Sequence, residues 1–286
     1  MSTILDGLSL GAIYALIALG YTMVYGIAKM LNFAHGDIIM VGAYAIFVML
    51  ASTNLLLALV VSVVLCAVMG VVVEKLAYKP LRSASPLAVL ITAIGVSYFL
   101  QGTAQLIFGS KSQPITLPSL GSLQIGNFQV ELRTVVTLGV GALLMVGLTL
   151  FVKCTRTGRA MLAVSEDKGA AQLMGVNVNR IIMITFAVGS TLAACASFFY
   201  LLQIPSVSPT LGAMPGIKAF AAAVIGGIGS IPGAMVGGVL LGLVEKICTS
   251  IPALNPYTTA IEFGLLILIL LVRPIGLMGM RRREKV

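Results

Sequence analysis

The sequence predicts an all-α polytopic membrane protein that forms one domain over residues 1–286. Hydrophobic residues make up 59% of the chain and charged residues only 9%, far below the roughly 25% charged fraction of soluble domains. The apolar runs allow about eight crossings of a bilayer, at about 20 residues per crossing. The net charge of +9 comes from basic residues spread along the chain. This spread is typical of membrane-protein loops, so nucleic-acid binding is not expected.

The predicted spans are apolar segments bounded by charged residues, Pro or clusters of Asn and Ser. They cover residues 4–27, 36–51, 55–73, 86–108, 133–152, 180–202, 217–247 and 257–272. Basic residues gather in three stretches, 75–82, 153–180 and 273–283. Because positively charged loops stay on the cytoplasmic side, we expect these three stretches to be cytoplasmic. Counting spans back from them places the N-terminus outside.

The apolar segment 217–247 contains a turn rich in Gly and Pro. Three apolar segments separate two cytoplasmic stretches, which requires an even number of crossings, so we expect 217–247 to be a hairpin. Its turn includes Gly226, Gly227, Gly229 and Pro232, and both residue types break helices. Irregular backbone at membrane depth borders protein or a wet cavity, so we expect these four residues to line a translocation path. One long, kinked and tilted helix is the alternative.

The stretch 109–132 lies between two predicted spans and has a different pattern. Pro114, Pro118, Gly121 and Gly126 interrupt it, and apolar residues alternate with polar ones from 123 to 130. Alternation of this kind between turn residues predicts a small β-hairpin. We expect the hairpin to lie on the extracytoplasmic face.

A polar island, Asn32-Phe33-Ala34-His35-Gly36-Asp37, separates the first two apolar segments with almost no loop. Ionisable residues near membrane depth are costly and usually face a pathway or a partner. A broken helix here would expose backbone amides that can bind an anionic group such as a carboxylate. We therefore include Asn32, His35 and Gly36 in the candidate translocation path. The alternative is an ordinary cytoplasmic turn in which Asn32 caps the next helix.

The cytoplasmic stretch 153–180 is long and polar for so apolar a chain, and it predicts a short helix capped at its start and followed by Gly. Acidic residues in its first turn would stabilise the helix by interacting favourably with the positive end of its dipole. A small-residue face would suit docking into a groove on a soluble partner, although a purely structural connection stays possible. The candidate coupling residues are Ser165 as the cap, Glu166 and Asp167 in the first turn, Ala170 and Ala171 on the face, and Gly175 after the end.

Further along, small residues recur at four-residue spacing at Gly229, Gly233 and Gly237, beside Gly238 and Gly242. Such spacing lets helices approach closely, within one chain or between subunits. A Walker A pattern, GxxxxGK[ST], is absent from the sequence, so any ATP that drives this protein must bind to another subunit.

Three sequence strings carry a family resemblance: 11–16 (GAIYAL), 32–36 (NFAHG) and 218–234, which ends in AVIGGIGSIPGA. Together they closely resemble the permease subunits of high-affinity branched-chain amino-acid ABC importers, particularly the H-type subunit. The resemblance covers nearly the whole chain. Permeases for urea or short-chain amides are close relatives and remain an alternative, although the string 165–171 is nearer to the amino-acid type.

The resemblance implies a permease of the bacterial inner membrane that is not itself an enzyme. Its implied partners are a second permease subunit in a heterodimer, two cytoplasmic ATPase subunits that bind ATP and Mg, a soluble or lipid-anchored substrate-binding protein, and membrane lipid. No cofactor is expected on this chain. In the family, the loop that matches 158–176 contacts the ATPases. An intramembrane enzyme would need convergent ionisable groups, and a passive channel would leave the capped cytoplasmic helix unexplained.

Overall fold

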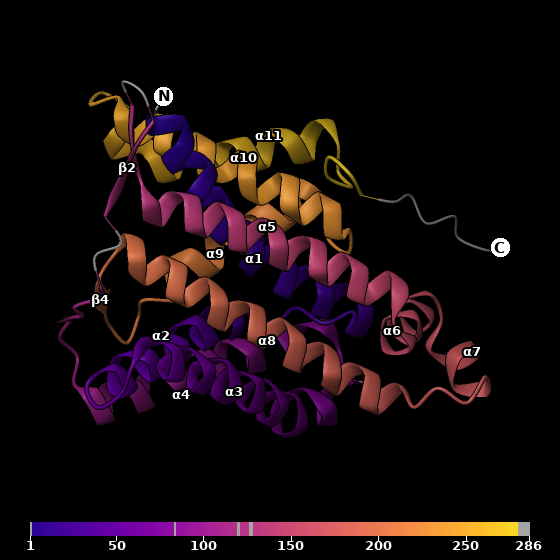
Figure 1. Ribbon diagram of the computed structural model, residues 1–286. Coiled ribbons are helices and arrows are strands. Elements are labelled where there is room, and N and C mark those ends of the chain that lie inside the picture. The colour runs from indigo at the N-terminus through magenta and orange to yellow at the C-terminus, as the bar shows by residue number, and fades with distance from the viewer. Residues whose placement is uncertain (1, 83, 119–120, 126–127, 280–286) are drawn as a thin grey trace.

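The computed structural model describes residues 2–279 except 83, 119–120 and 126–127. It is a bundle of helices with a little β-structure at one end (Figure 1). The helices are α1 (Ser2–Ala28), α2 (His35–Leu50), α3 (Leu55–Val73), α4 (Pro86–Phe108), α5 (Leu132–Cys154), α6 (Arg156–Glu166), α7 (Lys168–Leu173), α8 (Val178–Gln203), α9 (Ala213–Gly226), α10 (Ile231–Ser250) and α11 (Thr258–Val272). A π-helical turn, Glu74–Tyr78, and a 3-10 turn, Lys79–Leu81, extend α3, and another 3-10 turn, Asn255–Tyr257, precedes α11.

Seven helices of the described chain are long and apolar enough to cross a membrane, judged by length and composition. Polar caps start several of them: the side chains of Asn54, Ser85, Asn177 and Ser230 accept hydrogen bonds from the first turns of α3, α4, α8 and α10. Such caps satisfy backbone donors that have no partner within the helix. The prediction of an all-α polytopic membrane protein is confirmed.

The first span, α1, forms the centre of the bundle and is enclosed almost all round by other helices. It packs mainly against α10, and α8, α9 and α5 cover its other sides. Glycines allow the closest approach: a Cβ added to Gly11 would lie 2.7 Å from Val239 Cα, and one on Gly238 would overlap Ala15. Gly242 faces Gly11 in the same way, so the glycine ladder of α10 serves packing within the chain.

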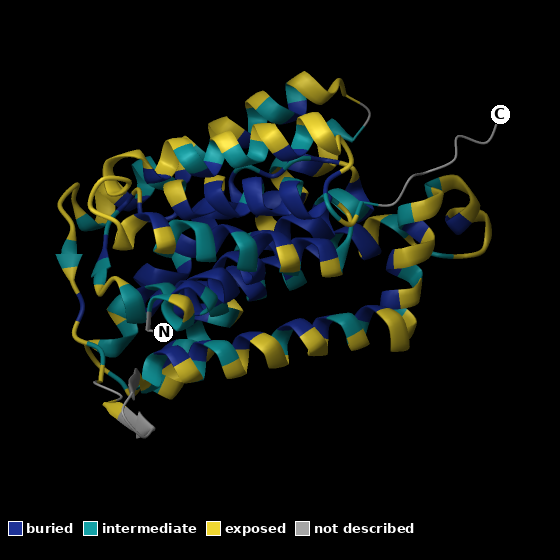
Figure 2. Ribbon diagram, turned by 90° about the horizontal axis from the view of Figure 1, so that it is seen from above, coloured by how far each residue is buried: buried dark blue, intermediate teal, exposed yellow. Residues whose placement is uncertain are grey.

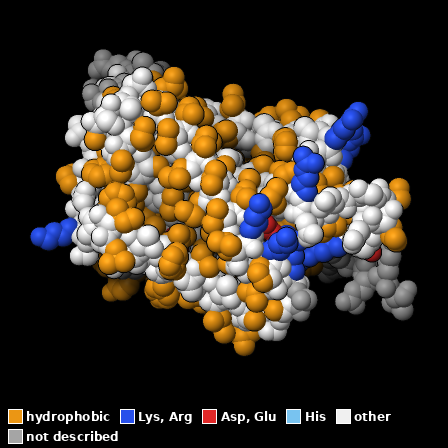
Figure 3. Space-filling model, turned by 90° about the horizontal axis from the view of Figure 1, so that it is seen from below, with side chains coloured by type: hydrophobic (Ala, Val, Ile, Leu, Met, Phe, Trp, Pro, Cys, Tyr) orange, Lys and Arg blue, Asp and Glu red, His pale blue; other side chains and the backbone are white. Residues whose placement is uncertain are grey.

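The outer helices α3, α4, α5 and α11 expose large apolar side chains along much of their length. Figure 2 shows this pattern, with buried residues in the inner helices and exposed ones on the outer helices. In Figure 3 hydrophobic side chains cover most of one face, and Lys and Arg gather mainly at one end of it. Apolar outer surfaces over a helical bundle are what lipid contact requires.

The segment 217–247 is two antiparallel helices rather than one. α9 ends at Gly226 and α10 begins at Ile231, and a Cβ on Gly237 would overlap the backbone of Ala222 on the facing helix. The predicted hairpin is therefore confirmed, and the alternative of one kinked helix is wrong.

The β-structure lies at the same end of the bundle as the N-terminus (Figure 1). Strands β2 (Ser122–Ile125) and β3 (Phe128–Glu131) pair antiparallel, with Ser122 opposite Glu131, as predicted for this stretch. A second small pair joins β1 (Gln113–Pro114) to β4 (Ser206–Val207). The end of the bundle that carries both strand pairs is called the hairpin end below. The opposite end, called the basic end, holds α6, α7 and the connection 75–82; Arg281, Arg282 and Arg283 lie outside the described residues.

Candidate functional site

Two apolar helices of the described chain, α2 and α9, are shorter than a membrane span, whereas the 3-10 turn before α11 extends that helix to 18 residues. α2 has 16 residues and α9 has 14, so they extend about 24 Å and about 21 Å at 1.5 Å per residue. The hydrocarbon core of a bilayer is about 30 Å thick. Each short helix follows a non-helical stretch, 29–34 before α2 and 204–212, which includes β4, before α9. α2 and α9 are therefore half-helices that begin inside the bundle.

The two half-helices touch where they begin. A Cβ added to Gly36 would lie 2.6 Å from Gly212 O, and one added to Gly216 would lie 2.8 Å from Gly36 Cα. Real Cβ atoms do not approach backbone so closely, which is why glycine occupies these positions. This contact, Gly36 with Gly212 and Gly216, is called the glycine crossing below.

The glycine crossing lies near the middle of the bundle. The His35 imidazole, next to Gly36, occupies the space that a side chain on Gly20 would need, and Gly20 O lies 3.4 Å from a Cβ added to Gly189. Gly189 is about 17 Å from the start of α8 and about 21 Å from its end, at 1.5 Å per residue. His35 and Gly36 thus lie near the middle of the bundle rather than in a turn at its end, which favours the interpretation as a path over that as an ordinary cytoplasmic turn.

Polar side chains around the crossing are buried and mostly paired. The Tyr78 hydroxyl donates a hydrogen bond to Asn32 Oδ1 over 2.8 Å, and Gln101 donates to Asp37 Oδ1 over 2.8 Å. Asn32 therefore does not cap α2, whose first turn has no side-chain cap. The His35 ring meets Tyr21 edge-on, with centroids 4.8 Å apart, and its Nε2 has no hydrogen-bond partner among the described residues.

Chemically, the crossing combines two helix N-termini with a buried imidazole. Helix N-termini carry backbone N–H donors and the positive end of the helix dipole, which favour carboxylates. In this structure Gly36 and Gly212 are in backbone contact, so a ligand could reach these groups only if the half-helices separated. Of the residues predicted for a path, the structure brings Asn32, His35 and Gly36 together here.

The glycine turn 226–232 is not part of this crossing. A Cβ on Gly26, near the end of α1, would lie 3.4 Å from Gly229 Cα, so the turn lies toward the basic end. Gly226 and Gly227 are buried, and Met278 N donates to Gly226 O over 2.9 Å. Gly229 and Pro232 are exposed. The turn is separate from the contact of Gly36 with Gly212, but Ile228 of the turn and Asn32 of the polar island line one small pocket together with Tyr21.

The segment 153–180 folds as two short helices, which corrects the prediction of one. α6 is capped by Thr155 and contains Ser165, whose hydroxyl donates to Leu162 O, and Glu166 ends it. Asp167 is the cap of α7, since its Oδ1 accepts from Gly169 N and Ala170 N. An aspartate can do this as well as a serine.

The residue that ends α7 agrees with the prediction, whereas the predicted docking face of α7 does not. Gly175 follows α7 with a φ of 83°, as expected for a residue that ends a helix in the left-handed region. Ala170 is exposed, but Ala171 is buried against the bundle, so the two do not share a docking face. The exposed apolar side chains are Leu173 and Met174, which are 91% and 84% exposed. Such exposure on a projecting segment suits a protein partner.

Sequence reasoning missed a buried charge network between α9, α10 and α11. Lys218 Nζ lies 2.8 Å from Glu245 Oε1 and 3.2 Å from Glu262 Oε2, and the Tyr14 hydroxyl donates to Glu245 Oε2 over 2.7 Å. Charged groups inside a membrane protein pair with one another in this way. Lys218 within an apolar run was the signal that could have revealed it.

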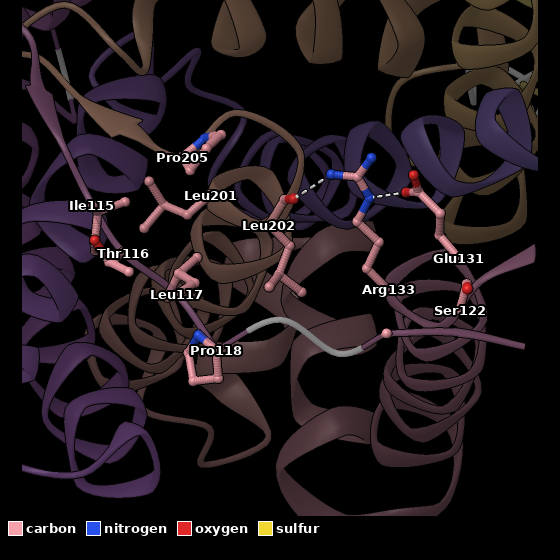
Figure 4. A pocket seen from close by; sticks show the side chains of 11 residues that line it. Ile115, Thr116, Leu117, Pro118, Ser122, Glu131, Arg133, Leu201, Leu202 and Pro205 are labelled. Carbon is pink, nitrogen blue, oxygen red and sulfur yellow. Dashed lines mark hydrogen bonds and ion pairs between the residues drawn. The ribbon is translucent and has the colours of Figure 1, made fainter.

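A cavity of about 610 Å³ lies at the hairpin end, between residues 115–118 and 121–122 on one side and the end of α8 on the other (Figure 4). Leu117, Leu201 and Leu202 form an apolar wall. On the other side Arg133 pairs with Glu131 and donates to Leu202 O over 3.0 Å. Arg133 thereby joins the start of α5 to the end of α8.

These features define a class of protein: a membrane transport subunit. Half-helices that meet at mid-depth are the arrangement that transporters use for passage, and the apolar surface embeds the chain in lipid. Among the described residues no group of three or more His, Cys, Asp or Glu could hold a metal ion.

Comparison with known proteins supports this class. The family profile described as "Branched-chain amino acid transport system / permease component" matches residues 3–270. The chain is 42% identical to the high-affinity branched-chain amino acid transport system permease protein BraD of Pseudomonas aeruginosa, covering 100% of this chain and 98% of the relative. It is also 42% identical to LivH of Escherichia coli K12, covering 98% and 96%. A probable LivH of Methanocaldococcus jannaschii is 28% identical, covering 92% and 88%.

The chain therefore belongs to the permease components of branched-chain amino acid transport systems. The resemblance seen in the sequence is confirmed. The predicted location, the bacterial inner membrane, is confirmed with it.

Proposed function

We propose that this chain is the permease subunit of an ATP-binding-cassette importer and forms one half of its membrane channel. Its substrates are branched-chain amino acids, which a substrate-binding protein delivers to the hairpin end. The identity of 42% to BraD and LivH along the full length carries this proposal. The names of these relatives favour branched-chain amino acids over urea or short-chain amides. A second, related permease subunit completes the channel.

Two ATPase subunits, which bind ATP and Mg, dock on α6 and α7 at the basic end. Exposed Leu173 and Met174 offer apolar contact, and Arg159 on α6 adds an exposed positive charge to the same cytoplasmic segment. Movement of α7 reaches the bundle directly, because Lys168 Nζ donates to Ala28 O at the end of α1 over 2.9 Å. The segment 165–175 is thus a lever between the partner and the central span.

The translocation path runs past the glycine crossing. When the half-helices separate, the N-termini of α2 and α9 face the carboxylate of the amino acid, and Asn32, His35 and Gly36 border the opening. Apolar residues of α9, among them Met214 and Ile217, are exposed beside it and suit a branched side chain. Gly229 and Pro232 of the glycine turn lie at the exit toward the basic end.

The test is ATP hydrolysis and uptake by the complex of this chain with its partner subunits. Leu173→Asp places a charge on the proposed docking surface without changing buried packing. We expect loss of substrate-stimulated ATP hydrolysis and of leucine uptake, with normal membrane insertion. Ser110→Asp is the matched control, because it adds the same charge at an exposed site near the hairpin end. Wild-type stimulation in Leu173→Asp would refute the coupling role of α7.

A further inference from the structure

A crevice of about 350 Å³ opens at the basic end, between the end of α1, the connection 29–31 and the start of α4. One wall is apolar and includes Leu31, Val89 and Leu90. Three described residues that line the crevice are basic, Lys29, Arg82 and Lys168, and none of the described lining residues is acidic. The crevice therefore joins positive charge to apolar surface in one place.

The positive charges are held in position by the fold. Arg82 pairs with the buried Glu74 and donates from Nη1 to Asn179, while its buried Nε has no hydrogen-bond partner among the described residues. Lys168 is fixed by its bond to Ala28 O. Burial lowers the pKa of the Lys168 amine, and the charge of Arg82 lowers it further. Arg82 and Lys168 are therefore close enough for their charges to repel each other, and an anion bound between them would relieve this repulsion.

Helix α4, which forms another wall of the crevice, adds to the positive electrostatic field of the basic residues. α4 begins at the crevice with Ser85 as its cap and Pro86 in its first turn. The N-terminus of a 23-residue helix carries the positive end of its dipole and favours phosphate groups.

The apolar wall continues onto the lipid-facing surface. Leu87 and Ile91, one turn apart on α4, are 63% and 60% exposed, and Leu76 at the end of the α3 span is 75% exposed. Figure 3 shows basic side chains gathered where the hydrophobic field ends. A ligand that fills this region needs an anionic group beside long apolar chains.

We propose that the crevice binds the phosphate headgroup of an anionic phospholipid, with the acyl chains lying along α3 and α4. Lys29, Arg82 and Lys168 contact the phosphate. Free inorganic phosphate shares the headgroup chemistry but makes no use of the apolar wall, so the lipid is the ligand that the whole crevice fits. Because Lys168 belongs to α7, the bound lipid also fastens the coupling segment to the end of α1.

The chain contains no Trp, which permits a direct test on the purified full chain in vesicles. Leu90→Trp places a single fluorophore in the crevice. We expect brominated phosphatidylglycerol to quench it more strongly than brominated phosphatidylcholine. Lys29→Asn should reduce this selectivity about fivefold, the effect of one basic residue near a membrane surface. Asn suits the position because the φ of Lys29 is 60°, in the left-handed region.

Lys75→Gln is the matched control, since it removes an exposed positive charge at the same end but outside the crevice. It should leave the selectivity unchanged. Equal quenching by both lipids, or equal loss of selectivity in Lys29→Asn and Lys75→Gln, would overturn the proposal. Displacement of the brominated lipid by excess inorganic phosphate would overturn the choice of a lipid over a free anion. If Leu90→Trp does not fold, native mass spectrometry of lipids retained by the Trp-free chain gives the same comparison.

Discussion

Replacing Lys218 with Met should destabilise the bundle more than any single change at its surface. Lys218 is the described cation that pairs with both Glu245 and Glu262. Removing one partner of a buried ion pair usually costs about 3–5 kcal/mol, because the remaining charge is buried without compensation. Glu245 is 18% exposed and keeps its bond from Tyr14, whereas the Glu262 side chain is only 2% exposed. Most of the loss therefore comes from Glu262, whose buried carboxyl would lose its cation, while Glu245 keeps a partner.

We expect the Lys218→Met chain to lose about 3 kcal/mol of unfolding free energy, the lower end of that range. Reversible denaturation of the purified chain in mixed micelles measures the loss. Lys153→Met, at an exposed position on α5, should stay within about 0.5 kcal/mol of wild type.

A second variant separates lost charge pairing from lost packing. Lys218→Met combined with Glu262→Gln removes the uncompensated charge and should recover at least half of the stability. A Lys218→Met chain as stable as wild type would refute the network's role. No recovery in the double variant would mean that packing, rather than charge, sets the loss.

Three further predictions concern the path and the topology. Gly36→Leu should prevent closure at the glycine crossing and abolish uptake, at a cost of about 1–3 kcal/mol in stability; Gly95→Leu, where a side chain meets nothing within 4 Å, should transport normally. Gly229→Leu should reduce uptake without blocking membrane insertion, since Gly229 has a φ of 94° and a side chain there costs about 1–2 kcal/mol; unchanged uptake would remove the turn from the path. Reporter fusions should indicate cytoplasm at Arg159 and the outside at Gly121, and a cytoplasmic Gly121 would reverse the orientation.

The elements whose pattern is local could be predicted from the sequence. Apolar length predicted the spans, and the cluster of Gly and Pro over 226–233 predicted the break between α9 and α10. Gly227 and Gly229 adopt positive φ there, and Pro232 suits the first turn of the helix that follows. Gly175 was predicted for the same reason, since its positive φ follows from helix termination. The small β-hairpin followed from alternation between turn residues.

Features set by distant packing could not be predicted. The run 36–51 looks like a full span, and only the contact of Gly36 with Gly212 shows that α2 starts at mid-depth. Ser165 and Asp167 are both residue types that can cap a helix. Because α6 continues to Glu166, Ser165 lies inside α6 and Asp167 caps α7. Lys218 and Glu262 are 44 positions apart, so their pairing depends on how α9 and α11 meet.

The central position of α1 constrains how the chain is made. α1 is synthesised long before its main neighbour, α10, which begins at Ile231. Roughly 200 residues must be synthesised in between, which takes about 10–40 s at the usual speed of translation. During this time the small-residue face of α1 around Gly11 has only lipid, the insertion machinery or a chaperone beside it. Assembly of this permease is therefore a late, post-insertion event, and ribosome stalling or truncation before α10 would leave an unassembled first span for quality-control proteases to recognise.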